Sequence, residues 1–363
     1  MNLLITGIGG PTPRSFSLAL RKYSKYDTFR FIGTDINPLA YGLYQDTLFE
    51  KTFVIPRPDA EGYWGIIEEI VKRESIDLAI VLSEVEVLAW SKKGETSQLP
   101  CKVLLPDSRL AELLFDKAKM TELLDPLHLV PQSISFDRDY SQINEVFDKL
   151  GNVFWVRSSS GTSGLGSLKI DSPESLKNWI QINPYVQTFL ASQYLPGRNL
   201  ACKLLYYNGK LLRTATAERV NYIMAKVAPS GITGNTSFGR LLNEAKIVDV
   251  ATEAMDYLFA ITGAEKHGFF TVDLKEDEKG NPLITEINIR HVAFTQCFAA
   301  GGANFCEDTI RLLSDDSTFD FNYRQYQFEE GLIFLRDVDQ EPILMKEEDL
   351  LSKDKVAELF FAK

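Results

Sequence analysis

The chain has 363 residues, of which 45% are hydrophobic, so it is long enough for about two or three globular domains with substantial cores. Acidic residues outnumber basic ones by 50 to 39, which gives a formal net charge of −11 at pH 7. This negative charge disfavours a general nucleic-acid or anionic-membrane surface, and small molecules are the expected partners.

The first hundred residues alternate strand and helix signals. Apolar runs at 2–6, 29–35, 51–56, 77–82 and 102–106 predict strands, and 14–22, 63–73 and 85–92 predict helices. This order predicts an α/β fold that begins with an open, doubly wound parallel sheet in an N-terminal domain, residues 1–106. Ligands of such sheets bind beyond the carboxyl ends of the strands, where residues 7–10, Asp35 and residues 83–84 fall.

The middle of the chain predicts a helix followed by a small, mobile section. Asp107 and Ser108 predict the start of a helix that runs to about residue 124 and carries Lys117. The small section, at about 121–194, holds two strand signals, 154–158 and 167–170, and a helix signal at 173–182. A glycine- and serine-rich loop, 158–166, joins the two strands.

Hairpin-like strands follow residue 192, and a helix signal at 243–262 ends at Gly263. Two apolar runs, 269–274 and 283–290, then flank Lys279, Gly280, Asn281 and Pro282, which are strong turn formers. The tail from about residue 311 contains one further predicted strand, 331–338. No run approaches 18 apolar residues, so no membrane span is expected.

The second hairpin is the most informative feature of the chain. If it reverses about Lys279 and Gly280, Asp273 lies directly opposite Glu286, because both are equally far from the turn. Strand alternation also places Glu286, Asn288 and Arg290 on one face, with Thr285, Ile287 and Ile289 on the other.

Two opposed carboxylates repel each other unless a cation lies between them. Asp273, Glu286 and Asn288 are hard oxygen ligands that suit Mg²⁺ bound jointly with phosphates, and Arg290 could hold a phosphate oxygen. The alternative is an ordinary charged hairpin face, since salt bridges such as Glu286 with Arg290 are common on sheets.

The loop after Arg157 is a second candidate site. It joins two strands and has no Lys-Ser/Thr after its last glycine, so it is not a Walker loop. Its small residues would still let backbone amides approach phosphate oxygens, and Arg157 would add a fixed cation. The alternatives are a flexible hairpin loop and, for Lys117, an ordinary solvated lysine.

Cysteine and histidine usage exclude several other chemistries. The cysteines form no CxxC pair, and the first residues lack the features of a signal peptide, so a reducing, cytoplasmic setting is expected. The three histidines lie far apart, which disfavours zinc chemistry and a Ser-His-Asp triad: they are His128, His267 and His291.

The order of these features resembles the ATP-grasp superfamily, in particular a single synthetase unit of the carbamoyl-phosphate synthase large chain and biotin carboxylase branch. The resemblance covers about residues 1–310, and its most specific motif is Thr-Glu-Ile-Asn-Ile-Arg at 285–290, which matches E-x-N-x-R. It implies an ATP-grasp domain at 107–310 whose lid is the small section at about 121–194. Residues 311–363 would then be a C-terminal extension that packs on this domain.

The resemblance also implies roles for individual residues. It makes Asp273, Glu286 and Asn288 the magnesium ligands and Arg290 the arginine that faces the γ-phosphate. The implied nucleotide contacts are Lys117, Arg157, Ser158, Ser159, Ser160, Gly161, Thr162, Ser163, Gly164, Gln193, Tyr194, Leu195, Asn199 and Lys203. Arg157 replaces the commoner lysine, and Asn199 stands where a ribose-binding glutamate is usual.

The implied activity is an ATP-dependent carboxylate-amine ligase with ATP and Mg²⁺ as cofactors, Mn²⁺ being an acceptable substitute. The acceptor carboxylate is expected within reach of Arg219, Arg290 and the loop 230–237, although Arg219 could instead be a structural ion-pairing residue. The sequence does not determine the oligomeric state, and a homodimer is one possibility.

Three other functions remain alternatives. One is a carboxyphosphate-forming enzyme that uses bicarbonate, and another is a non-catalytic ATP sensor. The third is an NAD(P)-dependent oxidoreductase, which the loop at 7–12 disfavours because it lacks the final glycine of GxGxxG and contains a proline.

Overall fold

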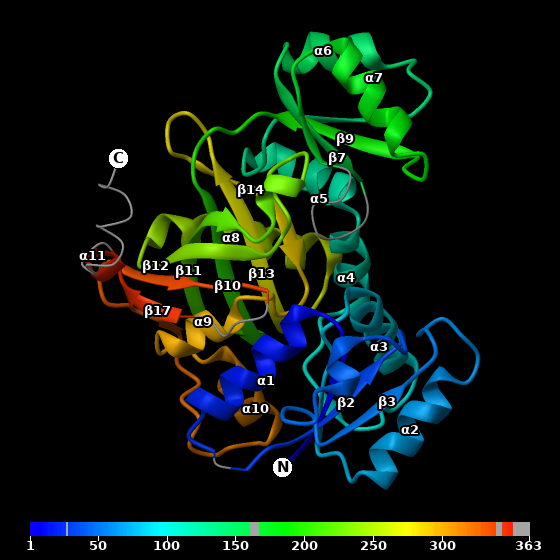
Figure 1. Ribbon diagram of the computed structural model, residues 1–363, viewed down its shortest axis with the longest axis vertical. Helices are drawn as coiled ribbons and strands as arrows, with labels where there is room; N and C mark the ends of the chain where they lie inside the picture. Colours follow the sequence, from blue (N-terminus) through cyan, green and yellow to red (C-terminus); the bar gives the residue numbers. More distant parts are fainter. Residues whose placement is uncertain (27, 160–166, 339–342, 351–363) are drawn as a thin grey trace, which may run out of the picture.

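The computed structural model describes residues 1–26, 28–159, 167–338 and 343–350. Within these residues the chain forms three sheets (Figure 1). A parallel sheet belongs to the N-terminal part at the lower right, a small antiparallel sheet stands at the top, and a large sheet lies to the left between them. None of the helices in this described part is long and apolar enough to cross a membrane.

The N-terminal sheet has the strand order β3-β2-β1-β4-β5, and all of its strands run parallel. Helix α1 (Pro11–Tyr23) shares a core with Leu3 of β1, whereas α2 (Tyr63–Arg73) and α3 (Glu84–Thr96) share another core with Leu4. Because successive residues of a strand point to opposite faces, helices cover both faces of this sheet. The predicted doubly wound arrangement is confirmed. The strands are β1 (Asn2–Thr6), β2 (Arg30–Asp35), β3 (Lys51–Val54), β4 (Leu78–Ile80) and β5 (Lys102–Val103), with a short 3-10 helix at Tyr41–Tyr44.

The sheet reverses its strand order between β1 and β4. In doubly wound sheets, ligands bind at such a switch point, outside the carboxyl ends of the strands. Gly7 follows β1 and Ser83 follows β4. The loops that contain them are therefore where the N-terminal domain is expected to contribute to a ligand site.

The predicted helix 108–124 is in fact two helices, α4 (Ser108–Phe115) and α5 (Lys117–Leu124). The chain breaks at Asp116, whose carboxylate caps α5 by accepting hydrogen bonds from the backbone N–H groups of Ala118 and Lys119 at 3.0 and 3.2 Å. Aspartate favours this capping position, so it begins a new helix instead of continuing the old one. A 3-10 turn, Asp125–Leu127, follows α5.

The small domain has its own sheet, in the order β6-β9-β7-β8, and its own core. Helices α6 (Ile143–Leu150) and α7 (Pro173–Ile182) pack on the sheet, as the upper part of Figure 1 shows. Side chains from both helices and from the central strands share the core, among them Val146, Trp179 and Phe189. The strands are β6 (Ser133–Asp137), β7 (Phe154–Ser158), β8 (Leu168–Ile170) and β9 (Thr188–Gln193).

The large sheet follows the order β14-β13-β10-β11-β12-β16-β17, with β15 paired to β11. On one face, α8 (Ala245–Thr262) packs against Cys202 and Leu204 of β10, whereas Ala201 and Leu205 share a core with α9 (Thr295–Ala300) and α10 (Phe305–Leu313). The strands are β10 (Asn199–Tyr207), β11 (Lys210–Tyr222), β12 (Thr236–Leu242), β13 (Gly268–Glu276), β14 (Pro282–Asn288), β15 (Arg324–Gln325), β16 (Leu332–Leu335) and β17 (Ile343–Lys346), with a 3-10 turn at Ala225–Val227.

The tail adds more structure to this sheet than the sequence predicts. Instead of one strand it supplies β15, β16 and β17, and then α11 (Glu347–Leu350). β16 pairs with β12 through Phe238↔Leu335 and Arg240↔Ile333, so the tail extends the sheet. The limits of the domains stay a prediction, but the three sheets occupy residues 2–103, 133–193 and 199–346.

Candidate active site

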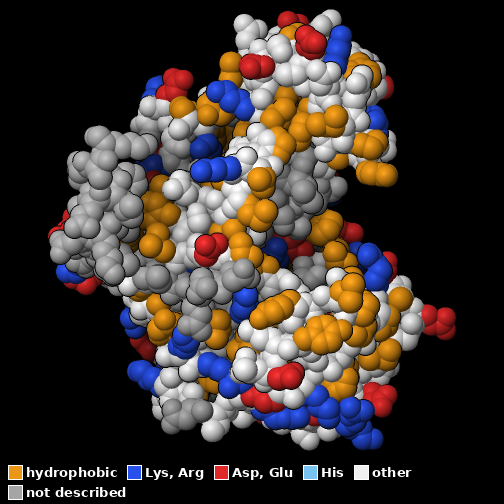
Figure 2. Space-filling model, viewed as in Figure 1, with side chains coloured by type: hydrophobic (Ala, Val, Ile, Leu, Met, Phe, Trp, Pro, Cys, Tyr) orange, Lys and Arg blue, Asp and Glu red, His pale blue; other side chains and the backbone are white. Residues whose placement is uncertain are grey.

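A cavity of about 500 Å³ lies where the small domain, the large sheet and the N-terminal loops meet. Figure 2 shows the surface indented between the small domain above and the N-terminal domain below. The cavity brings together most of the predicted site residues that the structure describes: Lys117, Arg157, Ser158, Gln193, Tyr194, Leu195, Asn199, Arg219, Asp273, Glu286, Asn288 and Arg290. Residues more than 170 positions apart in the sequence thus share one cavity.

The β13–β14 hairpin pairs Asp273 with Glu286, as the sequence predicts. The turn itself is centred on Lys279 and not between Lys279 and Gly280 as predicted, because Glu276 pairs with Pro282. Continued without a break, this register would place Asp273 opposite Thr285. A β-bulge next to Asp273 shifts the pairing by one residue and brings Glu286 opposite it.

Because of the bulge, Thr285 lies on a different face of the hairpin from the one predicted. Simple alternation places it on the face away from Glu286, but both residues line the cavity. The Thr285 hydroxyl donates a hydrogen bond to the backbone oxygen of Asp273 at 3.1 Å, which ties the two strands together at the bulge. Ile287 and Ile289 do lie in the core on the other face, with α8.

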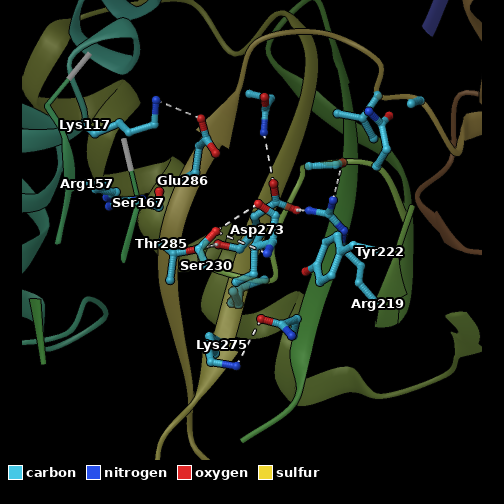
Figure 3. A pocket seen from close by; sticks show the side chains of 18 of the residues that line it. Lys117, Arg157, Ser167, Arg219, Tyr222, Ser230, Asp273, Lys275, Thr285 and Glu286 are labelled. Atoms are coloured by element: carbon cyan, nitrogen blue, oxygen red, sulfur yellow. Dashed lines mark hydrogen bonds and ion pairs between the residues drawn. The ribbon is translucent and has the colours of Figure 1, made fainter. Parts of the chain in front are cut away.

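Asp273 is held by two neighbours. Its Oδ1 lies 3.0 Å from Nη1 of Arg219 (Figure 3). Its Oδ2 accepts a hydrogen bond of 3.2 Å from the amide of Asn288. Burial raises the pKa of Asp273, and the charges of Arg219 and Glu286 act in opposite directions on it. A cation that entered the site would favour the ionised form of this carboxylate.

Glu286 faces the cations of the cavity. Its Oε1 lies 3.1 Å from Nζ of Lys117, the first residue of α5. The break at Asp116 therefore positions Lys117, whose backbone N–H also donates to the oxygen of Ser159 at 3.1 Å. Burial alone would raise the pKa of Glu286, but Lys117 and Arg157 hold it below its ordinary value.

Arg157 and Arg290 bring further positive charge. The Nε atoms of both are buried and, among the described residues, meet no hydrogen-bond partner. Burial lowers the pKa of Arg157. Nη2 of Arg290 lies 3.3 Å from Oε1 of Glu84, the first residue of α3, so Arg290 links the hairpin to the N-terminal domain. Burial raises the pKa of Glu84 against the effect of Arg290.

Most of the predicted phosphate loop lies outside the described residues, namely Ser160, Gly161, Thr162, Ser163 and Gly164. The residues on either side of this segment are described. Ser158 and Ser167 both line the cavity, so the two ends of the loop meet it.

The connection between the small domain and the large sheet forms another wall. Gln193, Tyr194 and Leu195 line the cavity there, and Nζ of Lys169 lies 4.3 Å from the centre of the Tyr194 ring. Asn199 accepts a hydrogen bond of 3.1 Å from Nζ of Lys275. Lys275 lines the cavity too, although the sequence analysis did not select it.

Lys203 lies elsewhere. It is fully buried beneath α9, where its Nζ donates to the hydroxyl of Thr295 at 2.9 Å and lies within 5.4 Å of three phenylalanine rings. Burial lowers its pKa to about 7. It does not line the cavity, so we do not retain it as a nucleotide contact.

Sequence reasoning missed one basic side chain of the cavity wall, Lys275. Lys275 alternates with Asp273 along β13, and this spacing is the signal that could have found it. The sequence does predict a ligand near residues 7–10, Asp35 and residues 83–84, and Gly7, Gly10 and Ser83 line the cavity. Asp35 is not part of the lining, but its carboxylate accepts a hydrogen bond of 2.7 Å from the N–H of Gly9.

The cavity is positively charged although the whole protein is acidic. Among the described residues its lining contains five basic side chains and two acidic ones, a formal excess of three positive charges: Lys117, Arg157, Arg219, Lys275 and Arg290 against Asp273 and Glu286. A concave site of this charge attracts anions, because its low-dielectric walls focus the field.

No protein-family model matches the sequence, and no curated protein matches it either. Solved structures do match. N5-carboxyaminoimidazole synthetase from Staphylococcus aureus, complexed with ADP, has a TM-score of 0.68 at 15% identity over 98% of this chain and 86% of that one. L-amino acid ligase from Bacillus licheniformis has a TM-score of 0.64 at 16% identity over 92% of this chain and 78% of that one.

A third similar structure is the biotin carboxylase domain dimer of the Hydrogenobacter thermophilus 2-oxoglutarate carboxylase, in complex with MgADP, ADP and bicarbonate. Its TM-score is 0.66 at 14% identity, over 92% of this chain and 74% of that one. At such identities the likeness concerns the fold, and the expected ATP-grasp fold is confirmed.

Proposed function

We propose that this chain, with its ATP-grasp fold, is an ATP- and Mg²⁺-dependent ligase that activates a small carboxylate as an acyl phosphate for attack by an amine. The observation that carries the proposal is the convergence of Asp273, Glu286 and Asn288 with basic side chains in one cavity. ADP and phosphate would be the other products.

The chemistry of the donor groups fits magnesium. Two carboxylates and one amide, on paired strands, offer hard oxygen ligands, and Mg²⁺ prefers few protein carboxylates together with phosphates and water. Asp273 and Glu286 face each other across the hairpin, where like charges repel unless a cation lies between them. Mg²⁺ bound there would neutralise negative charge on the phosphate groups during phosphoryl transfer.

The unpartnered nitrogens fit a polyphosphate. A buried guanidinium nitrogen without a hydrogen-bond partner costs free energy, and the Nε atoms of Arg157 and Arg290 are two such groups among the described residues. Phosphate oxygens are good acceptors for them. Arg157 lies on β7 of the small domain, and Arg290 follows β14 of the large sheet by two residues, so a nucleotide between them would be held from both sides.

The proposed reaction has two steps. In the first, an oxygen of the acceptor carboxylate attacks the γ-phosphorus, and the bond from that phosphorus to the β–γ bridging oxygen breaks, which releases ADP. In the second, the amine attacks the acyl carbon, phosphate leaves with the electrons of the C–O bond, and the amine loses a proton. No protein nucleophile is needed, so positioning and charge are the contributions of the protein.

In this proposal Lys117, Arg157 and Arg290 bind the phosphates, and the connection from Gln193 to Leu195 lies against the adenine. Arg219 holds Asp273 in place and lies near the acceptor. The solved ligases and the ADP complexes among the similar structures support the proposal. The bicarbonate in one of them supports the alternative of a carboxyphosphate-forming enzyme.

The test is an assay for ADP release with Mg²⁺ over a panel of carboxylates and amines, with bicarbonate as one arm. Hydroxylamine replaces the amine in a parallel set and traps acyl phosphate as a hydroxamate. We expect ADP release that depends on a carboxylate, together with hydroxamate. ADP release with bicarbonate alone would favour the carboxyphosphate alternative. Tight ATP binding with no ADP release across the panel would contradict the ligase and favour an ATP sensor.

A further inference from the structure

A second cavity, of about 810 Å³, adjoins the first. The two share wall residues from three parts of the chain, among them Gly10, Ser167 and Ser230. The new cavity extends from this shared wall between the N-terminal loops, the segment 223–235 and the chain after β16. Its volume is within the range of about 300–1,000 Å³ that is usual for small-molecule sites.

Much of the wall of the second cavity is apolar. Ile8 and Pro11 come from the N-terminal domain, and Met224 and Val227 come from the segment after β11. Tyr41, Met224 and Val227 are 66%, 63% and 72% exposed, although large apolar side chains gain by burial. A ligand with an apolar body would cover them.

Two arginines meet at one side of the same cavity. Arg14, on α1, donates a hydrogen bond of 2.9 Å to the backbone oxygen of Val338, and Arg336 donates one of 2.9 Å to the backbone oxygen of Thr236. Among the described residues neither forms a salt bridge. The nearby Asp337 accepts a hydrogen bond of 2.7 Å from the N–H of Val338.

The field at this side is positive. Burial lowers the pKa of Arg336, and the like charges of Arg14 and Arg219 lower it further. Arg14 and Arg336 donate these hydrogen bonds to uncharged backbone oxygens, so an anion that binds between the two cations stabilises them. A guanidinium is well suited to this, because its planar array of donors matches carboxylate and phosphate groups.

We infer that the second cavity binds a substrate of the reaction other than ATP, and that this substrate is an organic anion with an apolar body. Its carboxylate or phosphate lies between Arg14 and Arg336, and its body covers Met224, Val227 and Tyr41. The reacting end then points through the shared wall to the metal end of the first cavity. This inference rests on the proposed ligase function for its catalytic sense, but the binding site is defined by the cavity itself.

The experiment measures binding by calorimetry to the full chain, with Mg²⁺ and a non-hydrolysable ATP analogue and again without them. The probes are 3-phenylpropionate, phenyl phosphate and the neutral 3-phenylpropanol. The variants are Arg14→Gln and Arg336→Gln, whose glutamines keep a donor for the backbone contacts, and Met224→Asp on the exposed wall. Arg57→Gln is the control, because Arg57 is an exposed arginine of the same domain away from both cavities.

We expect at least one anionic probe to bind the wild type and to bind more tightly than the alcohol. Its affinity should fall by about tenfold or more in Arg14→Gln and Arg336→Gln, as for the loss of a hydrogen bond to a charged group, and stay unchanged in Arg57→Gln. Met224→Asp should also weaken it. The relative affinities of carboxylate and phosphate probes identify the anionic group.

Two results would overturn the inference. One is no binding of either anionic probe up to about 10 mM. The other is binding that all the variants retain. A failure of the proposed function is distinguishable, because the ligase activity is tested by ADP release, whereas these titrations measure binding to the second cavity with and without the nucleotide analogue.

Discussion

Replacing Glu286 with glutamine is the most direct test of the proposed metal site. The change removes one negative charge from the hairpin but keeps the size of the side chain. Without this charge the cavity lining has a formal excess of four positive charges instead of three, counted over the described residues. Nucleotide should therefore bind no more weakly in the absence of Mg²⁺, while the dependence on Mg²⁺ should be lost.

The expected cost to folding is small. Glu286 and Lys117 are 29% and 11% exposed in their side chains, with 3.1 Å between the charged atoms. Glutamine still offers an oxygen to Lys117, so we expect a loss of about 1–2 kcal/mol, below the ~3–5 kcal/mol of a fully buried pair that loses one partner. Because proteins of this kind have about 5–15 kcal/mol of stability, the variant should fold.

The expected cost to turnover is large. A preorganised group that stabilises transition-state charge contributes about 3 kcal/mol or more, which corresponds to roughly 100-fold in rate. ADP release at saturating nucleotide, measured over a range of Mg²⁺ concentrations, gives this figure directly. Glu278→Gln is the matched control, since Glu278 is exposed in the turn of the same hairpin.

The result that would refute the assignment is turnover within about threefold of the wild type with an unchanged Mg²⁺ dependence. Equal losses in Glu286→Gln and Glu278→Gln would also refute it, because the effect would then follow from a change in the hairpin as a whole.

Three further predictions concern single groups. Arg157→Met should raise the Kd of ATP by about tenfold or more and leave the free energy of unfolding unchanged or higher, since it removes a buried cation whose Nε meets no partner among the described residues. Nucleotide titration measures the Kd, and urea unfolding measures the free energy of unfolding. An unchanged affinity for ATP would contradict this prediction. Burial raises the pKa of Asp273. As the pH is lowered, the affinity for Mg²⁺ should therefore begin to fall at a higher pH than it would with an ordinary aspartate, whose pKa is near 4, and the unliganded protein should gain stability from this group over the same range. A constant Mg²⁺ affinity down to about pH 4 would contradict this prediction. Gly239→Ala should destabilise the fold by about 1–3 kcal/mol, because the new Cβ would lie 2.6 Å from the backbone oxygen of Glu218; an unchanged urea midpoint would contradict it.

The hairpin was predictable because its information is local. Alternating apolar residues and a cluster of turn formers predict two paired strands, and the structure pairs Asp273 with Glu286 as expected. The prediction nevertheless assumed a pairing register next to the turn that differs by one residue from the observed one, and the bulge compensates for that difference. Residues 283–290 on either side of Thr285 include no glycine or proline that would have indicated a bulge.

Side-chain direction was harder to predict than position in a motif. Asn199 precedes Lys203 by four residues on β10, so both lie on the same face of the large sheet. Alternation alone would therefore put both in the site. Helix α9 covers that face at Lys203 and leaves it open at Asn199. Such covering depends on how distant segments pack, and no local pattern specifies it.

The second cavity was beyond sequence reasoning for the same reason. Arg14 and Arg336 are more than 300 residues apart, and neither stands in a motif. They meet because β16 pairs with β12 and so brings the following segment to the start of α1, where Arg14 reaches the backbone of Val338. The tail had been expected only to pack on the domain, whereas its strand supplies part of a wall.

Arg219 connects the two cavities. Its guanidinium holds Asp273 through Nη1, and its Nε and Nη2 donate to the hydroxyl of Thr236 and the backbone oxygen of Gly234, in the segment that leads into β12. These contacts occupy all three of its nitrogens, so Arg219 is better placed to position Asp273 and this segment than to clamp an acceptor by itself. Thr236 also accepts the hydrogen bond of Arg336 through its backbone oxygen. The proposed metal end of the first cavity and the positive side of the second are therefore both linked to Thr236, and we expect a ligand that shifts this segment to change the position of Asp273.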